Sequence, residues 1–198
     1  MTSAATLQDA GRRRWIAATS IAGGVGVIAT SVPFVASMAP SERARASGAP
    51  VEVDLRPIGF GELATVEWRD KPVWVLRRTP EMLAALRTHD ALLADPRSSR
   101  TAQQPDYAHN EFRSIKPDIV VLVGICTHLG CTPTFRPQPG AADLGSAWPG
   151  GFYCPCHGSR FDLAGRVFKN VPAPSNLEVP PHRYRSDSTL LVGEESPA

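Results

Sequence analysis

The stretches Cys126-Thr127-His128-Leu129-Gly130-Cys131 and Cys154-Pro155-Cys156-His157-Gly158-Ser159 contain all four cysteines of the chain and one histidine each. The first stretch has a Cys-x-His spacing, and the second has a Cys-x-x-His spacing. Together they offer two thiolates and two imidazoles, which is a donor set used by metal centres in proteins. The other two cysteines then need a different role.

Two kinds of metal centre use this donor set. A zinc ion accepts two cysteines and two histidines in tetrahedral geometry. A Rieske 2Fe-2S centre places both cysteines on one iron and both histidines on the other. A zinc site has no evident use for Cys131 and Cys156, whereas two loops around a cluster gain rigidity if a disulfide ties them together.

The two stretches resemble the cluster-binding loops of the Rieske proteins of respiratory quinol-cytochrome c reductases. The resemblance covers residues 126–131 and 154–159 and implies one 2Fe-2S cluster. By this resemblance, Cys126 and Cys154 would bind the buried iron. His128 and His157 would bind the outer iron, and the exposed His157 would contact quinol and accept its hydrogen.

The resemblance also implies a disulfide between Cys131 and Cys156. Soluble Rieske ferredoxins and oxygenase domains share only the four ligands, so the extra pair points to the quinol-oxidising branch of the family. Small subunits of arsenite oxidases can carry a similar pair, and they are the alternative identification.

Five more residues take their expected roles from the same resemblance. The hydroxyl of Ser159 would donate a hydrogen bond to a bridging sulfide and raise the reduction potential. Phe161 stands where many relatives have a tyrosine that donates to a ligand sulfur, so we expect a lower potential here. Pro172 and Pro174 would cover the cluster, and Leu129 would pack against the docking surface.

The N-terminal part of the sequence predicts a membrane anchor. Residues 15–39 contain no charged side chain, and as a helix they are long enough to cross a hydrocarbon core of roughly 30 Å. Pro33 would kink this helix or mark its exposed end. Just before this run, Gly11-Arg12-Arg13-Arg14-Trp15-Ile16 resembles a twin-arginine export signal. We therefore expect 1–14 to be a cytoplasmic segment and 15–39 to be the transmembrane helix.

The rest of the chain predicts a hinge and a single soluble domain. Residues 40–50 are small, polar and bounded by prolines, as in solvated linkers. Residues 51–198 have the length of one domain, and the resemblance makes them a Rieske domain. A stable disulfide belongs in an oxidising compartment, so we expect the head to face the periplasm across the bacterial inner membrane.

The head has the sequence pattern of a mainly antiparallel β fold with a short helix and long loops. Alternating apolar residues predict strands at 51–56, 63–68 and 73–76, and apolar residues predict strands at 119–125, 151–153 and 189–192. A hairpin is expected over 160–168. Thr79, Pro80 and Glu81 predict a helix start, with the helix reaching about Ala94.

Other segments of the head predict surface structure. Residues 95–118 are polar and rich in turn formers, and 136–151 are rich in glycine and proline, so both are expected to run over the surface. His89, His109 and His182 have no Cys or His partner nearby in the sequence and are expected to be surface histidines rather than ligands.

The family resemblance implies electron transfer within a larger complex. The chain would take electrons from quinol and pass them to a c-type cytochrome, with proton release, and would require a cytochrome b subunit and a cytochrome c subunit in a dimeric complex. The chain has no Cys-x-x-Cys-His motif for haem of its own. The net charge of +2 and the scattered arginines do not favour a nucleic-acid partner.

Overall fold

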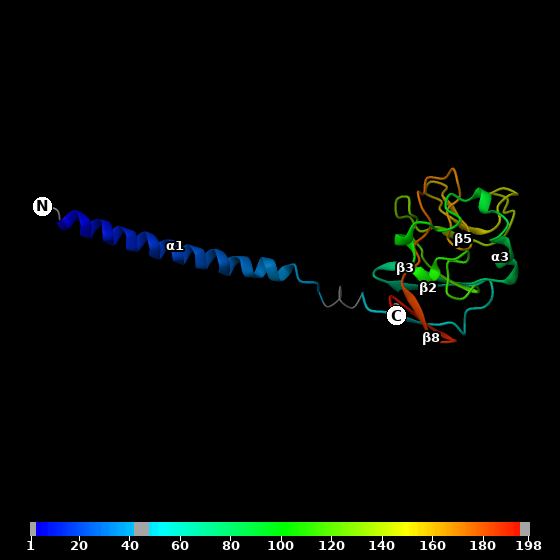
Figure 1. The fold of residues 1–198 in the computed structure, drawn as a ribbon, viewed down its shortest axis with the longest axis horizontal. Helices are drawn as coiled ribbons and strands as arrows, with labels where there is room; N and C mark the ends of the chain where they lie inside the picture. Colours follow the sequence, from blue (N-terminus) through cyan, green and yellow to red (C-terminus); the bar gives the residue numbers. More distant parts are fainter. Residues whose placement is uncertain (1–2, 42–47, 195–198) are drawn as a thin grey trace. The chain divides into compact units, whose positions relative to one another are not determined.

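The computed structural model describes residues 3–41 and 48–194, which form parts of two units, Met1–Ala46 and Ser47–Ala198 (Figure 1). The expected hinge, 40–50, lies in large part outside the described residues.

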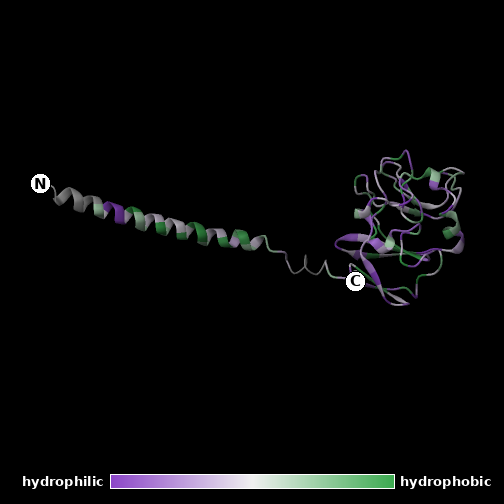
Figure 2. Cartoon of the chain, in the orientation of Figure 1, coloured by the Kyte–Doolittle hydropathy of each residue, from purple (hydrophilic) through white to green (hydrophobic). Residues whose placement is uncertain are grey.

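The first unit contains one long helix, α1 (Ser3–Ser37). Figure 2 shows hydrophilic residues near the start of α1 and mainly apolar residues after them. Residues Ala10–Ser37 are long and apolar enough to cross a membrane. Pro33 lies inside the helix, which continues to Ser37, so the expectation that Pro33 could mark its end is wrong. The chain thus has the expected single N-terminal apolar helix.

The second unit is built around a three-stranded sheet that has a hydrophobic cluster on each face. Strands β2 (Leu63–Trp68), β3 (Lys71–Arg77) and β4 (Ile119–Val123) pair antiparallel in the order β2-β3-β4. Because side chains alternate along a strand, Val73 and Val75 face one hydrophobic cluster while Trp74 and Leu76 face another. This sheet therefore separates two hydrophobic cores.

Two further three-stranded antiparallel sheets complete the head. The first has the order β1-β9-β8, with β1 (Val51–Asp54), β9 (Thr189–Val192) and β8 (His182–Ser186). It contributes Val53, Leu190 and Val192 to the core that contains Val73. The second has the order β5-β6-β7, with β5 (Thr134–Arg136), β6 (Gly151–Tyr153) and β7 (Arg160–Phe161). It contributes to the opposite core, which also contains the two free cysteines.

The helix that follows β3 is shorter than the sequence predicts. Helix α3 (Pro80–Ala85) starts as expected, because the side chain of Thr79 accepts a hydrogen bond from the backbone N–H of Met82. It ends at Ala85 instead of Ala94, and side chains donate hydrogen bonds to two carbonyls at this end. Thr88 Oγ1 donates to Ala85 O at 2.8 Å, and Arg166 Nη2 donates to Leu86 O at 2.6 Å.

Between α3 and β4, the chain forms three short 3-10 helices, and Leu93 makes an isolated β-bridge with Phe168. These helices are η1 (Asp90–Leu92), η2 (Thr101–Gln103) and η3 (Asp106–Ala108).

The segments expected on the surface are partly buried. In 95–118, Ala108, Arg113 and Ser114 lie in the interior. In 136–151, Leu144 and Trp148 form a third hydrophobic cluster with Leu93 and Phe168. Apolar residues that are isolated in a glycine-rich stretch carry no periodic signal, which is why the sequence pattern did not indicate their burial.

Two of the three histidines expected at the surface are also buried. His89 is 6 % exposed and its Nε2 lies 3.3 Å from Asp162 Oδ2, while its ring stacks on Phe168. His182 is 1 % exposed, and its Nδ1 lies 2.8 Å from Pro180 O. His109 is exposed, as predicted. The sequence does not indicate either partner: Asp162 lies 73 residues from His89, and His182 contacts a backbone carbonyl.

Candidate metal centre

The two cysteine- and histidine-containing loops have matching backbone hydrogen bonds. In the first loop, which follows β4, Cys126 N donates to Cys131 O at 2.7 Å, and Gly130 N donates to Cys126 O at 3.0 Å. In the second loop, after β6, Cys154 N donates to Ser159 O at 2.8 Å, and Gly158 N donates to Cys154 O at 2.9 Å. The two six-residue turns are thus closed in the same way.

A glycine occupies the fifth position of both turns for a conformational reason. Gly130 has a φ of 85° and Gly158 has a φ of 77°, and residues with a side chain rarely adopt these values.

The disulfide joins the two loops to each other. Cys131 and Cys156 are bonded, with their Cα atoms 6.7 Å apart. This pair was expected from the family resemblance. The sulfurs of Cys131, Cys154 and Cys156 lie within 4.8 Å of one another. Of these three, only Cys154 is a free thiol. The two free thiols of the chain are therefore Cys126 and Cys154.

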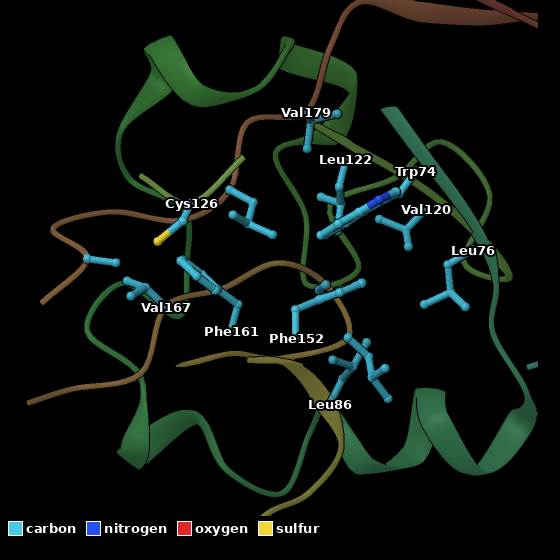
Figure 3. Packing of buried hydrophobic residues seen from close by; sticks show 14 of the residues in the cluster. Trp74, Leu76, Leu86, Val120, Leu122, Cys126, Phe152, Phe161, Val167 and Val179 are labelled. Atoms are coloured by element: carbon cyan, nitrogen blue, oxygen red, sulfur yellow. The ribbon is translucent and has the colours of Figure 1, made fainter. Parts of the chain in front are cut away.

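Both free cysteines are buried at the base of the loops. Cys126 and Cys154 are each 2 % exposed and belong to the same hydrophobic core as Phe152 and Phe161. Figure 3 shows Cys126 among the side chains of this core. Burial raises the pKa of the Cys154 thiol, and a hydrogen bond with the Cys126 side chain raises it further, against backbone hydrogen bonds that lower it. A bound metal would favour the thiolate form of both groups.

The two loop histidines lie together on the outer side. The rings of His128 and His157 are perpendicular, with centroids 4.8 Å apart. His128 is half-buried, and its Nδ1 is a buried atom with no hydrogen-bond partner among the described residues. A buried ring nitrogen without a partner is costly unless something else binds it. His157 is exposed.

This arrangement fits a Rieske cluster on three observations. Two buried thiols lie on one side, two adjacent imidazoles lie on the other, and one of those imidazoles has a buried nitrogen free for a metal. The donor set and the division into an inner cysteine pair and an outer histidine pair are those of Rieske centres.

Residues 172–175, the proline segment, are hydrogen-bonded to side chains of both loops. The hydroxyl oxygen of Ser159 accepts from Ala173 N at 3.0 Å, and Thr127 Oγ1 donates to Ser175 O at 2.7 Å. Pro172 and Pro174 on this segment are exposed. Because Ser159 accepts through its oxygen, its own O–H proton remains available to a second partner. No sequence pattern indicates the Thr127 contact, because its partner Ser175 lies 48 residues further along the chain.

Leu129 is the most exposed large apolar residue of the described head. Its side chain is 71 % exposed at the tip of the first loop, next to His128. Phe161, by contrast, is fully buried in β7. Its ring belongs to the core that contains both free cysteines, so a substitution of Phe161 would change the surroundings of these thiols.

A buried ionic network is centred on Asp162, three residues after the second loop ends at Ser159. Asp162 is fully buried and accepts hydrogen bonds from the backbone of Ala164 and from both the backbone and side chain of Arg166. Burial alone would raise the pKa of Asp162, but the hydrogen bond from His89 and the charge of Arg166 outweigh it and lower the pKa.

A second buried arginine binds the segment 95–118 to this region. Arg113 donates to Ala164 O at 3.0 Å and to Leu177 O at 2.7 Å. No sequence pattern indicates the contacts of Arg113, because its partners Ala164 and Leu177 lie 51 and 64 residues further along the chain.

Comparison with known proteins agrees with this geometry. Residues 96–181 match the family model of the Rieske [2Fe-2S] domain. The fold and site therefore define a Rieske iron–sulfur protein that carries one 2Fe-2S cluster.

Relatives narrow the class further. The chain is 62 % identical over 184 residues to the ubiquinol-cytochrome c reductase iron-sulfur subunit of Allochromatium vinosum, with 93 % of this chain and 88 % of that protein covered. It is 38 % identical over 195 residues to the subunit of the same name from Bradyrhizobium diazoefficiens, with 98 % of this chain and all of that protein covered. The chain belongs to the family of ubiquinol-cytochrome c reductase iron-sulfur subunits.

A solved structure described as a hyperthermophilic respiratory Complex III contains a similar chain, which is 25 % identical to this one. The match covers 90 % of this chain and 98 % of that chain, with a TM-score of 0.46. Family membership favours the reductase over the arsenite oxidase alternative and over a zinc domain.

Proposed function

We propose that this chain is the electron-transfer subunit that oxidises quinol in a cytochrome bc-type complex and passes the electron to a c-type cytochrome. The observation that carries the proposal is the pair of adjacent loop histidines, one of them exposed, above two buried cysteine thiols. When bound, the 2Fe-2S cluster supplies a one-electron centre whose imidazole ligands raise its potential above that of all-cysteine clusters.

The cluster would be held by two cysteines and two histidines of the loops. Cys126 and Cys154, both buried, are suited to the inner iron, and His128 and His157 to the outer iron. The unpartnered Nδ1 of His128 supports ligation through this nitrogen. Ligation through one ring nitrogen leaves the other nitrogen free to exchange a proton.

His157 is the proposed quinol contact. It is exposed, whereas His128 is half-buried, so His157 can accept a hydrogen bond from the quinol hydroxyl and take its proton. We expect Leu129 and Pro172 and Pro174, which are all exposed, to supply an apolar surface around these histidines. Such a surface suits docking onto a cytochrome b subunit and then onto a cytochrome c subunit, within a dimeric complex.

The proposed membrane arrangement follows from the first unit and the disulfide. Residues 1–14 would be a cytoplasmic twin-arginine segment, 15–39 the span and 40–50 a hinge, with the head in the periplasm. Two observations support this arrangement: the apolar helix over Ala10–Ser37 and the disulfide between Cys131 and Cys156. A disulfide persists in an oxidising compartment such as the periplasm.

A redox titration of the detergent-solubilised full-length chain tests the proposal. We expect the reduced cluster to give an EPR signal with a potential above about −150 mV, the lower end of the Rieske range. The potential should fall as the pH rises, because oxidation favours proton release from the ligating imidazoles. The exposed His109→Gln variant serves as a control that leaves this dependence unchanged. A low potential that does not vary with pH would contradict quinol oxidation.

A further inference from the structure

A hollow of about 470 Å³ lies in the surface of the head beside the second cluster-binding loop. Its lining comes from four separate segments: η1, the stretch before β6, the end of the second loop with the start of β7, and residues 168–171. Gly158, one of the lining residues, follows directly after His157. An occupant of this hollow would therefore lie close to the proposed metal centre.

The floor of the hollow is apolar and fixed in position. Trp148 and Phe168 are buried, their ring centroids lie 5.9 Å apart, and Leu144 packs against them. The indole N–H of Trp148 already donates to Arg136 O at 3.0 Å, so the ring offers only apolar atoms to an occupant. His89 stacks on Phe168 with centroids 5.7 Å apart, which holds that ring in place.

The rim of the hollow carries uncompensated positive charge. Arg160 and Lys169 both line it, and the lining contains no aspartate or glutamate. Lys169 Nζ donates to the neutral carbonyl of Ala91 at 2.8 Å. In the ranges 3–41 and 48–194, no ion pair joins either cation to a carboxylate.

We propose that this hollow binds a small amphipathic anion, a compound with an apolar body and a carboxylate or phosphate group. The apolar body would lie above the Trp148 and Phe168 rings and against Leu92, which lines the hollow and is 49 % exposed. The anionic group would lie between Arg160 and Lys169. Apolar pockets with a few polar groups at defined positions are the usual form of small-molecule sites. The chemistry alone is shared by free amphiphiles and by anionic lipids.

Binding can be measured by tryptophan fluorescence on the full-length, cluster-loaded chain in nanodiscs of neutral lipid. The probes are octanoate, its uncharged counterpart octanol, and inorganic phosphate. We expect saturable binding of octanoate, at least tenfold weaker binding of octanol, and still weaker binding of phosphate. The signal should be lost in Trp148→Phe, since the other tryptophans do not line the hollow.

Charge variants separate this site from general attraction to a cationic surface. The double variant Arg160→Gln/Lys169→Gln should bind octanoate at least tenfold more weakly. A matched double variant, Arg97→Gln/Lys116→Gln, removes two other cations of the head and should bind as the unaltered chain does. Equal binding of octanoate and octanol, or equal weakening in both double variants, would overturn the proposal.

A third set of fluorescence measurements, with and without anionic lipid, identifies the source of the anion. If nanodiscs containing an anionic phospholipid produce the Trp148 signal without octanoate, and the signal is absent from Arg160→Gln/Lys169→Gln, the lipid headgroup is the occupant. If only octanoate produces it, the site takes free amphiphiles. A signal that persists in Trp148→Phe under both conditions would show that the hollow is not the binding site.

Discussion

Replacing Ser159 by alanine should lower the reduction potential and loosen the proline segment at the same time. The side chain is fully buried, and its oxygen accepts a hydrogen bond from Ala173 N, itself nearly buried. Leaving that N–H without an acceptor costs about 1–3 kcal/mol of unfolding free energy. The free O–H proton is the group expected to donate to the cluster.

The size of the potential shift follows from the strength of that second bond. A hydrogen bond to a charged group contributes about 1.5–3 kcal/mol. If this bond favours the reduced form, its loss corresponds to about 60–130 mV for a one-electron centre, at 59 mV for each tenfold change. EPR-monitored redox titration of the full-length chain at pH 7 measures the potential, and thermal or denaturant unfolding measures stability.

The matched control is Thr127→Val. Thr127 also ties the proline segment to a ligand loop, through Ser175 O at 2.7 Å, but its hydroxyl proton is used in that bond. We expect Thr127→Val to cost about 0.5–1.5 kcal/mol and to move the potential by less than about 30 mV. If Thr127→Val lowered the potential as much as Ser159→Ala, loosening of the segment would explain both effects. The direct hydrogen bond from Ser159 would then be refuted.

Three other substitutions test separate parts of the structure. Phe161→Tyr adds a donor in the core that holds the free cysteines and should raise the potential, by about 59 mV for each 1.4 kcal/mol; an unchanged EPR-determined potential in a folded variant would contradict this expectation. Replacing Cys131 and Cys156 together by alanine opens a disulfide with a sequence separation of 25 and should cost about 3.5 kcal/mol in denaturant unfolding by the chain-entropy relation; a loss below about 1 kcal/mol would show that the disulfide contributes little. Burial lowers the pKa of His182 to about 4, although a hydrogen bond to Pro180 raises it, so the unfolded chain binds a proton at this histidine before the folded chain does as the pH falls. About 3 kcal/mol of the unfolding free energy should therefore be lost between pH 6.5 and pH 4. Denaturant unfolding should show no such loss in His182→Gln and the full loss in the exposed-histidine variant His109→Gln.

The parts of the candidate site that depend on close spacing could be proposed from the sequence. Cys126 and His128 are two residues apart, and Cys154 and His157 are three apart, so each half of the donor set could be recognised locally. The strands that lead into these loops, β4 and β6, were also predicted from their apolar content.

The supporting structure could not be predicted in the same way. Asp162 and His89 are separated by 73 residues, and Arg166 lies 80 residues from the carbonyl that it binds at the end of α3. A charged residue is expected at the surface when only the sequence is known, because its burial depends on partners that only the fold brings together. The same reason explains why His182 and much of 95–118 were expected outside the core.

The paired turns at the metal centre have a consequence for the speed of electron transfer. Each turn is closed by two backbone hydrogen bonds of its own, and the disulfide fixes one turn to the other. Groups held in place in advance need little rearrangement when the charge beside them changes. The loops should therefore relax only slightly on each gain or loss of an electron. A small reorganisation energy of this kind would permit fast transfer at a modest driving force.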